Sequence, residues 1–167
     1  MPIADALAGE LEHEAKITRS LIARVPDDRA SWKPHAKSMS MGELTIHLAN
    51  IESYGIAVAT RPELDFRASA GTGITHAKWT SRDDALALFD ANVEAAMRAV
   101  AALPDPRLRE PWTLRAGDHV VFTLPRLAAW RTFVMSHQIH HRGQLSVYLR
   151  LNDIPVPPIY GPSADEQ

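Results

Sequence analysis

Apolar residues recur at intervals of three and four in four separate stretches of the chain. In the first stretch, Ile3, Leu7 and Leu11 begin a series that continues to Val25, with charged residues between its members. This spacing places apolar side chains on one face of a helix. Proline breaks helix interiors, so the twelve prolines mark where such stretches end. The pattern predicts four helices, at residues 3–25, 41–60, 82–103 and 125–151.

Residues at the ends of these stretches support the predicted boundaries. Ser40 and Glu43 have the spacing of a capping box, in which each side chain bonds the backbone of the other. Ser81 is a suitable N-cap for the third helix. Pro125 stands at or near the first helical position, where proline is tolerated, and Asn152 stands where a C-terminal cap is expected.

The connections are predicted to be mostly irregular. Residues 62–80 form a long crossover, and the tail at 152–167 is too rich in proline to be helical. Before the last helix, "WTL" and "HVVF" flank a turn-like "RAGD", a pattern that suggests a short β-hairpin. Four amphipathic helices most simply form a four-helix bundle. We therefore expect an all-α protein with a single domain over residues 1–167.

Composition narrows the classes of function. The chain has 18 basic and 20 acidic residues, a balance that argues against a nucleic-acid-binding surface. It has no cysteine, which excludes disulfides and a thiolate nucleophile, so a metal site would need His, Asp or Glu. No stretch approaches the ~18 apolar residues of a membrane span. The N-terminal segment is acidic and unlike a signal peptide, so we expect a cytoplasmic protein without a membrane partner.

Three of the eight histidines lie within "SHQIHHRGQLSVYLR" in the last predicted helix. His137 and His141 fall on its apolar face, whose members are Trp130, Val134, His137, His141, Leu145 and Tyr148. Residues four apart on a helix have Cβ atoms ~6 Å apart, so both imidazoles can reach one ion. His140 is turned away by roughly 100°. The histidines predicted to lie on the surface are His13, His35, His76 and His119.

A third imidazole comes from the second predicted helix. His47 shares a face with Leu44, Ile51, Tyr54 and Val58, and therefore points inward. Ligand sites in bundles are built from side chains on facing helices. Three such histidines would leave a metal open to water or substrate, as in catalytic sites. The alternative is that these imidazoles are hydrogen-bonded core residues, because burial without any partner costs ~1–3 kcal/mol.

These segments resemble a known family. The run "HQIHHRGQLSVYLRLNDIPVPPIYGPSADE", with "SMGELTIHLANIESY" about ninety residues before it, is similar to the DinB/YfiT-like family of metal-dependent four-helix-bundle proteins. The resemblance implies an up-down-down-up helix order and a homodimer. It also implies a divalent metal bound through three histidines, which here are His47, His137 and His141. Some relatives are transferases or isomerases that use low-molecular-weight thiols.

We therefore predict a metal-dependent enzyme of hydrolase or thiol-dependent transferase type. Zn²⁺ or Ni²⁺ would be held by the three histidines and would act on a small-molecule substrate, with a low-molecular-weight thiol as a second candidate partner. The candidates for further catalytic roles are His140, Arg142, Tyr54, Glu52 and Tyr148. The alternative is a metal- or small-molecule-binding stress-response bundle without catalytic turnover.

Overall fold

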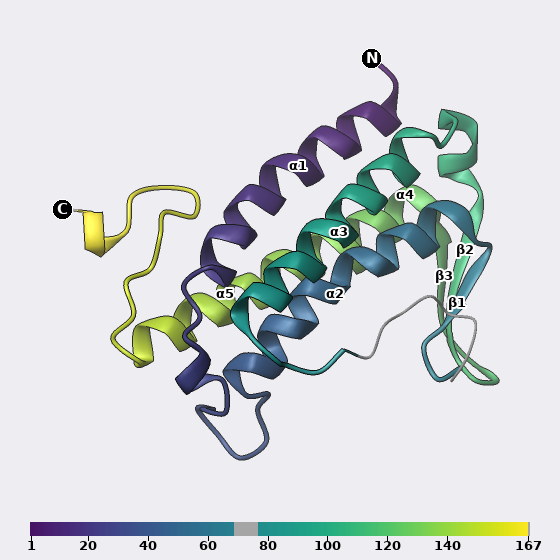
Figure 1. The fold of residues 1–167 in the computed structure, drawn as a ribbon. Helices are drawn as coiled ribbons and strands as arrows, with labels where there is room; N and C mark the ends of the chain where they lie inside the picture. Colours follow the sequence, from purple (N-terminus) through teal and green to yellow (C-terminus); the bar gives the residue numbers. More distant parts are fainter. Residues whose placement is uncertain (69–76, 167) are drawn as a thin grey trace.

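A computed structural model describes residues 1–68 and 77–166, and most of them are helical (Figure 1). Four long helical stretches lie beside one another, and a small sheet stands at one end of them. Helix α2 packs against α3, α1 packs against α3, and α5 contacts both α2 and α1. The long helices are α1 (Ile3–Ile22), α2 (Met41–Thr60), α3 (Arg82–Ala101) and α5 (Ser136–Leu151). No helix in the described part has an apolar stretch long enough to cross a membrane.

The helix starts agree with the sequence patterns more closely than the ends do. The capping box predicted at the start of α2 is confirmed, because Ser40 and Glu43 bond each other's backbone. Helix α1 ends at Ile22, earlier than predicted, because the amides of Arg24 and Val25 bond carbonyls only three residues back. The residue before proline is disfavoured in the α region, and Pro26 follows this tight turn. Helix α3 likewise ends at Ala101, two residues before the predicted position.

The predicted helix at 125–151 is not uniform. It begins with the short helix α4 (Arg126–Ala129), continues as a π-helical segment (Trp130–Met135) and then becomes α5. The Ser136 hydroxyl donates to the carbonyl of Arg131, five residues back, at 2.9 Å. Such π-helical segments are rare and occur often at functional sites. Hydrophobic spacing does not distinguish a π turn from an α turn, so the sequence did not predict it.

The sheet has three strands, of which β1 (Glu63–Asp65) was not predicted. Strand β2 (Pro111–Ala116) pairs antiparallel with β3 (His119–Pro125), and β1 pairs parallel with β2. Gly117 adopts a φ of 62° in the turn between β2 and β3, a value that favours glycine. Its amide donates to the Asp65 carboxylate at 2.9 Å, which ties this turn to the end of β1. Residues 69–76 of the predicted crossover lie outside the described part.

Helix α2 is buried on most of its surface and lies against the π-helical segment. A Cβ atom added at Gly55 would lie 3.1 Å from the ring of Trp130, closer than ordinary contacts. Glycine therefore allows α2 to approach the beginning of the last long helical stretch. This close approach places His47 of α2 opposite the first two turns of α5.

Candidate metal site

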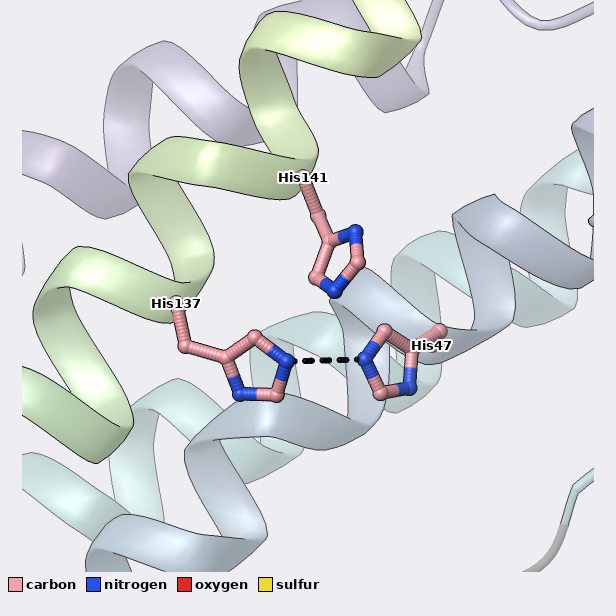
Figure 2. A group of neighbouring side chains, drawn as sticks. All are labelled: His47, His137 and His141. Atoms are coloured by element: carbon pink, nitrogen blue, oxygen red, sulfur yellow. Dashed lines mark hydrogen bonds between the residues drawn. The ribbon is translucent and has the colours of Figure 1, made fainter.

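The structure brings His47, His137 and His141 together between α2 and α5 (Figure 2). Their candidate ligand atoms all lie within 4.8 Å of one another. The Nε2 atoms of His47 and His137 are 3.1 Å apart. Helical phase predicted an inward direction for each of these side chains, and the family resemblance implied that the three form one site. The structure brings the three imidazoles together.

The three rings converge through their nitrogens rather than by stacking. The ring centroid of His47 lies 5.0 Å from that of His137 and 4.5 Å from that of His141, and the ring planes are inclined by 63° and 89°, respectively. The rings of His137 and His141 are 4.7 Å apart and inclined by 53°. Each of the three residues is partly exposed. The site is therefore accessible from outside the helices.

Gln144 fixes the orientation of one imidazole. Its Oε1 atom lies 2.7 Å from Nδ1 of His141, so Nδ1 carries the proton and donates this bond. The lone pair of His141 is then on Nε2, the atom that faces the other two rings (Figure 2). A hydrogen bond to the second ring nitrogen is the usual support of a metal-binding histidine. The sequence signal for Gln144 was its position three residues after His141, one helical turn away.

Electrostatics keeps the site uncharged at neutral pH. Burial lowers the pKa of His47 to about 4, with a further contribution from the neighbouring His141. Burial, again with the charge of His141, lowers the pKa of His137 to about 4, against a smaller opposing effect of the Phe133 carbonyl. The pKa of His141 is lowered by burial and raised in part by Gln144. Neutral imidazoles have the free lone pairs that a metal requires.

The three residues fit a divalent transition metal. Two Nε2 atoms at 3.1 Å can share one proton, but Nε2 of His141 has no hydrogen-bond partner among the described residues. Ligand nitrogens about 2.1 Å from a tetrahedral zinc ion would be roughly 3.4 Å apart, close to the separation of the first pair. Three imidazoles suit zinc, nickel, copper and iron alike. No carboxylate joins the cluster in residues 1–68 and 77–166.

Tyr54 and His140 lie next to the cluster. The Tyr54 ring is stacked at 6.2 Å from that of His137, and burial raises the pKa of its hydroxyl. His140 is exposed, and its ring is 4.8 Å from that of His141 in an edge-on arrangement. His13, His35 and His119 are exposed as predicted, whereas His76 lies outside the described residues.

Glu52 lies in the interior and not on the face of α2 that carries His47. Five residues separate the two, which corresponds to about 140° around a helix. The Glu52 side chain is fully buried, and both carboxylate oxygens are without a partner in the described structure. Burial raises its pKa to about 8, so the carboxyl group is mainly protonated at neutral pH.

Arg142 and Tyr148 are engaged in contacts between elements. Arg142 is 1% exposed and forms an ion pair with Glu14 of α1 at 2.6 Å. The hydroxyl of Tyr160 in the tail bonds both Arg142 and Glu14. Tyr148 donates to the carbonyl of Met39 and packs edge-on against Trp32. These contacts link α5 to α1, to the tail and to the loop before α2.

Four helical stretches and three imidazoles that converge from two of them define a helical protein with a histidine-lined candidate metal site. The sequence model of the DinB superfamily matches residues 10–145. The chain therefore belongs to the DinB superfamily. The uncharacterized protein YrdA of Bacillus subtilis strain 168 is 25% identical over 158 residues, which cover 93% of this chain and 86% of YrdA.

Two crystal structures share the fold. A DinB-like protein, YjoA, from Bacillus subtilis has a TM-score of 0.70 at 20% identity, covering 94% of this chain and 98% of YjoA. A DinB-like protein from Bacillus cereus ATCC 10987 has a TM-score of 0.68 at 18% identity, covering 92% of this chain and 95% of that protein. At this level of identity the likeness establishes the fold and carries no assignment of activity.

Proposed function

We propose that this protein is a metal-dependent enzyme whose ion is held by His47, His137 and His141. The observation that supports the proposal is the convergence of three imidazoles, with ligand nitrogens within 4.8 Å of one another. Their neutral state at pH 7 and the support of His141 by Gln144 are what a metal-binding set requires. We propose zinc or nickel, both of which imidazole binds well.

Three protein ligands would leave room for a small-molecule substrate. A divalent ion held there supplies Lewis-acid polarisation of a carbonyl and lowers the pKa of a coordinated water or thiol. The chain has no cysteine, so a thiol taking part in the reaction would come from a small molecule. The proposed reaction class is therefore hydrolysis or thiol-dependent group transfer. In either class the protein's residues would orient the substrate.

A second candidate function is binding of a metal or small molecule without turnover, as in a stress-response protein. It is favoured by the positions of two of the candidate catalytic residues, Glu52 and Arg142. Glu52 is buried away from the face of His47, and Arg142 is already paired with Glu14. Neither Glu52 nor Arg142 is therefore in a position to act as a general base or to bind an anion beside the imidazoles.

The decisive experiment is a measurement of metal content in protein purified without a histidine tag. We expect close to one equivalent of zinc or nickel after loading, and a loss of most of it in His137→Ala. His140→Ala is the matched control, because it removes an exposed imidazole from the same helix. Wild-type protein with less than about a tenth of an equivalent after loading would contradict the proposal. Metal binding with no turnover of thiol-transfer or hydrolysis substrates would favour the second candidate.

Three further features complete the proposal. We propose the up-down-down-up order, which is supported by the ribbon: α1 and α5 run one way, and α2 and α3 run the other (Figure 1). The family resemblance supports a homodimer, which size-exclusion chromatography with light scattering would test. We also propose a cytoplasmic location.

A further inference from the structure

Two aromatic side chains lie against the ring of His137. The ring centroid of Tyr54 is 6.2 Å from that of His137, with 7° between the planes. The corresponding values for Phe133 are 5.9 Å and 26°. Tyr54 and Phe133 also stack on each other at 5.1 Å and 23°. Three rings from α2, the π-helical segment and α5 therefore lie in nearly parallel planes; we call Tyr54 and Phe133 the aromatic pair.

The aromatic pair is partly exposed, like the three imidazoles beside it. A single half-exposed aromatic residue is common on protein surfaces and needs no explanation. Here the two rings share contacts with a candidate metal ligand, so their open surface adjoins the place where a substrate would bind. Ligand sites are typically lined by apolar and aromatic side chains around a few polar groups. The aromatic pair and the imidazoles together have this composition.

Two aromatic residues of the sheet contact Phe133. Trp112 of β2 is fully buried, and its ring lies 5.9 Å from that of Phe133. Phe122 of β3 meets Phe133 edge-on at 5.8 Å, with 72° between the planes. These contacts fix the orientation of Phe133 before any ligand arrives. A surface that is already ordered loses less conformational entropy on binding, which increases affinity.

The geometry suits a flat ligand group. Aromatic rings prefer offset stacking or edge-to-face contact with another π system, and the nearly parallel planes of Tyr54, Phe133 and His137 present such faces together. The Tyr54 hydroxyl has no hydrogen-bond partner within the part of the chain that the structure describes. It is therefore available to a polar atom of a ligand.

We infer that the site selects small molecules in which a metal-binding oxygen or sulfur is attached to a planar aromatic or conjugated group. That group lies against Tyr54 and Phe133 while the polar end faces the three imidazoles. The inference rests on the proposed metal site and names the class of substrate for it. It also assigns a role to the sheet, which positions the residue that contacts the planar group.

Hydroxamates of different shape test this selectivity. Benzohydroxamate, cyclohexanecarbohydroxamate and acetohydroxamate have the same metal-binding end, and the first two are similar in size but differ in planarity. With zinc-loaded protein in a calorimetric titration, we expect benzohydroxamate to bind about tenfold more tightly than the cyclohexane analogue. Equal or tighter binding of the cyclohexane analogue would overturn the inference.

Substitutions locate the source of the preference. Tyr54→Leu and Phe133→Leu should each reduce the ratio of the two affinities towards one, with zinc content unchanged. Phe66→Leu is the matched control, because Phe66 is an exposed aromatic residue outside this cluster, and it should keep the wild-type ratio. An undiminished ratio in both aromatic-pair variants would contradict the assignment. If a variant does not fold, magnetisation transfer from bound benzohydroxamate to the Tyr54 and Phe133 ring protons in wild-type protein decides the question.

The outcomes separate the two proposals. Wild-type protein that retains no zinc overturns the proposed function. Protein that retains zinc and binds acetohydroxamate, but shows no preference for the planar analogue, overturns only the inference about substrate class. Retained zinc with a preference that depends on Tyr54 and Phe133 supports both.

Discussion

The three-histidine site and the ion pair of Arg142 with Glu14 both involve α5, but their polar atoms are satisfied to different extents. Arg142 is buried and bonds a carboxylate, a backbone carbonyl and a hydroxyl. His137 and His141 are partly exposed, and Nε2 of His141 has no partner among the described residues. Completed pairing is typical of groups that stabilise a fold, whereas free lone pairs pointing at one place are typical of ligand sites.

Loss of Arg142 should have the largest effect on stability. Arg142→Met would leave the Glu14 carboxylate buried without its cation, and removing one partner of a buried ion pair costs about 3–5 kcal/mol. Urea denaturation would measure this decrease. The double variant Arg142→Met, Glu14→Gln should recover part of it. A decrease in the free energy of unfolding below about 1 kcal/mol would mean that Arg142 does not stabilise the fold, and it would again be a candidate for substrate binding.

Metal binding should have the next largest effect. Zinc present at a hundred times its dissociation constant would stabilise the wild-type protein by about 2.7 kcal/mol. His47→Leu should abolish this stabilisation while the metal-free variant keeps at least wild-type stability, because a half-buried neutral imidazole is replaced by an apolar group. Thermal unfolding with zinc and with a chelator would show the difference. An unchanged melting temperature on chelation would support the reading of these imidazoles as ordinary core residues.

Glu52 provides a third kind of polar group, which is fully buried and unpaired. Its pKa of about 8 in the folded protein is above the ordinary 4.5, so the group reduces stability as pH rises through that interval. Glu52→Gln should therefore increase the free energy of unfolding at pH 7, by on the order of 2 kcal/mol, and have little effect at pH 4. Urea titrations at the two pH values would measure this. The same increase at both would show that the carboxyl group is not responsible.

The smallest expected effect concerns Gln144. Its bond to Nδ1 of His141 should be lost in Gln144→Ala, and loss of such a supporting bond typically weakens metal affinity about tenfold or more. A competition titration with a zinc chelator would measure the dissociation constant. Gln144→Glu, which keeps an acceptor, should retain affinity. Unchanged affinity in the alanine variant would mean that Gln144 does not orient the ring.

Much of this site was predictable because helical phase is a local property. The positions of His137 and His141 one turn apart, and of His47 on an inward face, follow from spacing alone. Spacing did not predict which residues would pair with Arg142 or how deeply Glu52 would be buried. Arg142 was a candidate for substrate contact until its partners Glu14 and Tyr160 came together from distant parts of the chain. Glu52 was a candidate until the structure placed it in the interior.

Strand β1 and the π-helical segment could not be predicted from the sequence for a related reason. Strand β1 has three residues, too few for an alternation to be recognised, and it exists because β2 offers it a partner. The aromatic contacts of Phe133 depend on where the π-helical segment directs its side chain. Neither the pairing of β1 nor the π turn is encoded in a local repeat of apolar residues.

The π-helical segment at Trp130–Met135 sets a rotational offset between the two halves of the last helical stretch. Each residue of an α-helix advances by about 100° around its axis. Removal of one residue, such as Thr132, would let the segment close into regular α-helix. The deletion removes about 100° of rotation and the tighter α turns restore about the same amount, so α5 would keep its direction relative to Trp130, which is anchored against Gly55. Closing the segment without a deletion would instead turn α5 by about 100° and separate its imidazoles from His47. The one additional residue in the segment thus keeps His137 and His141 facing His47.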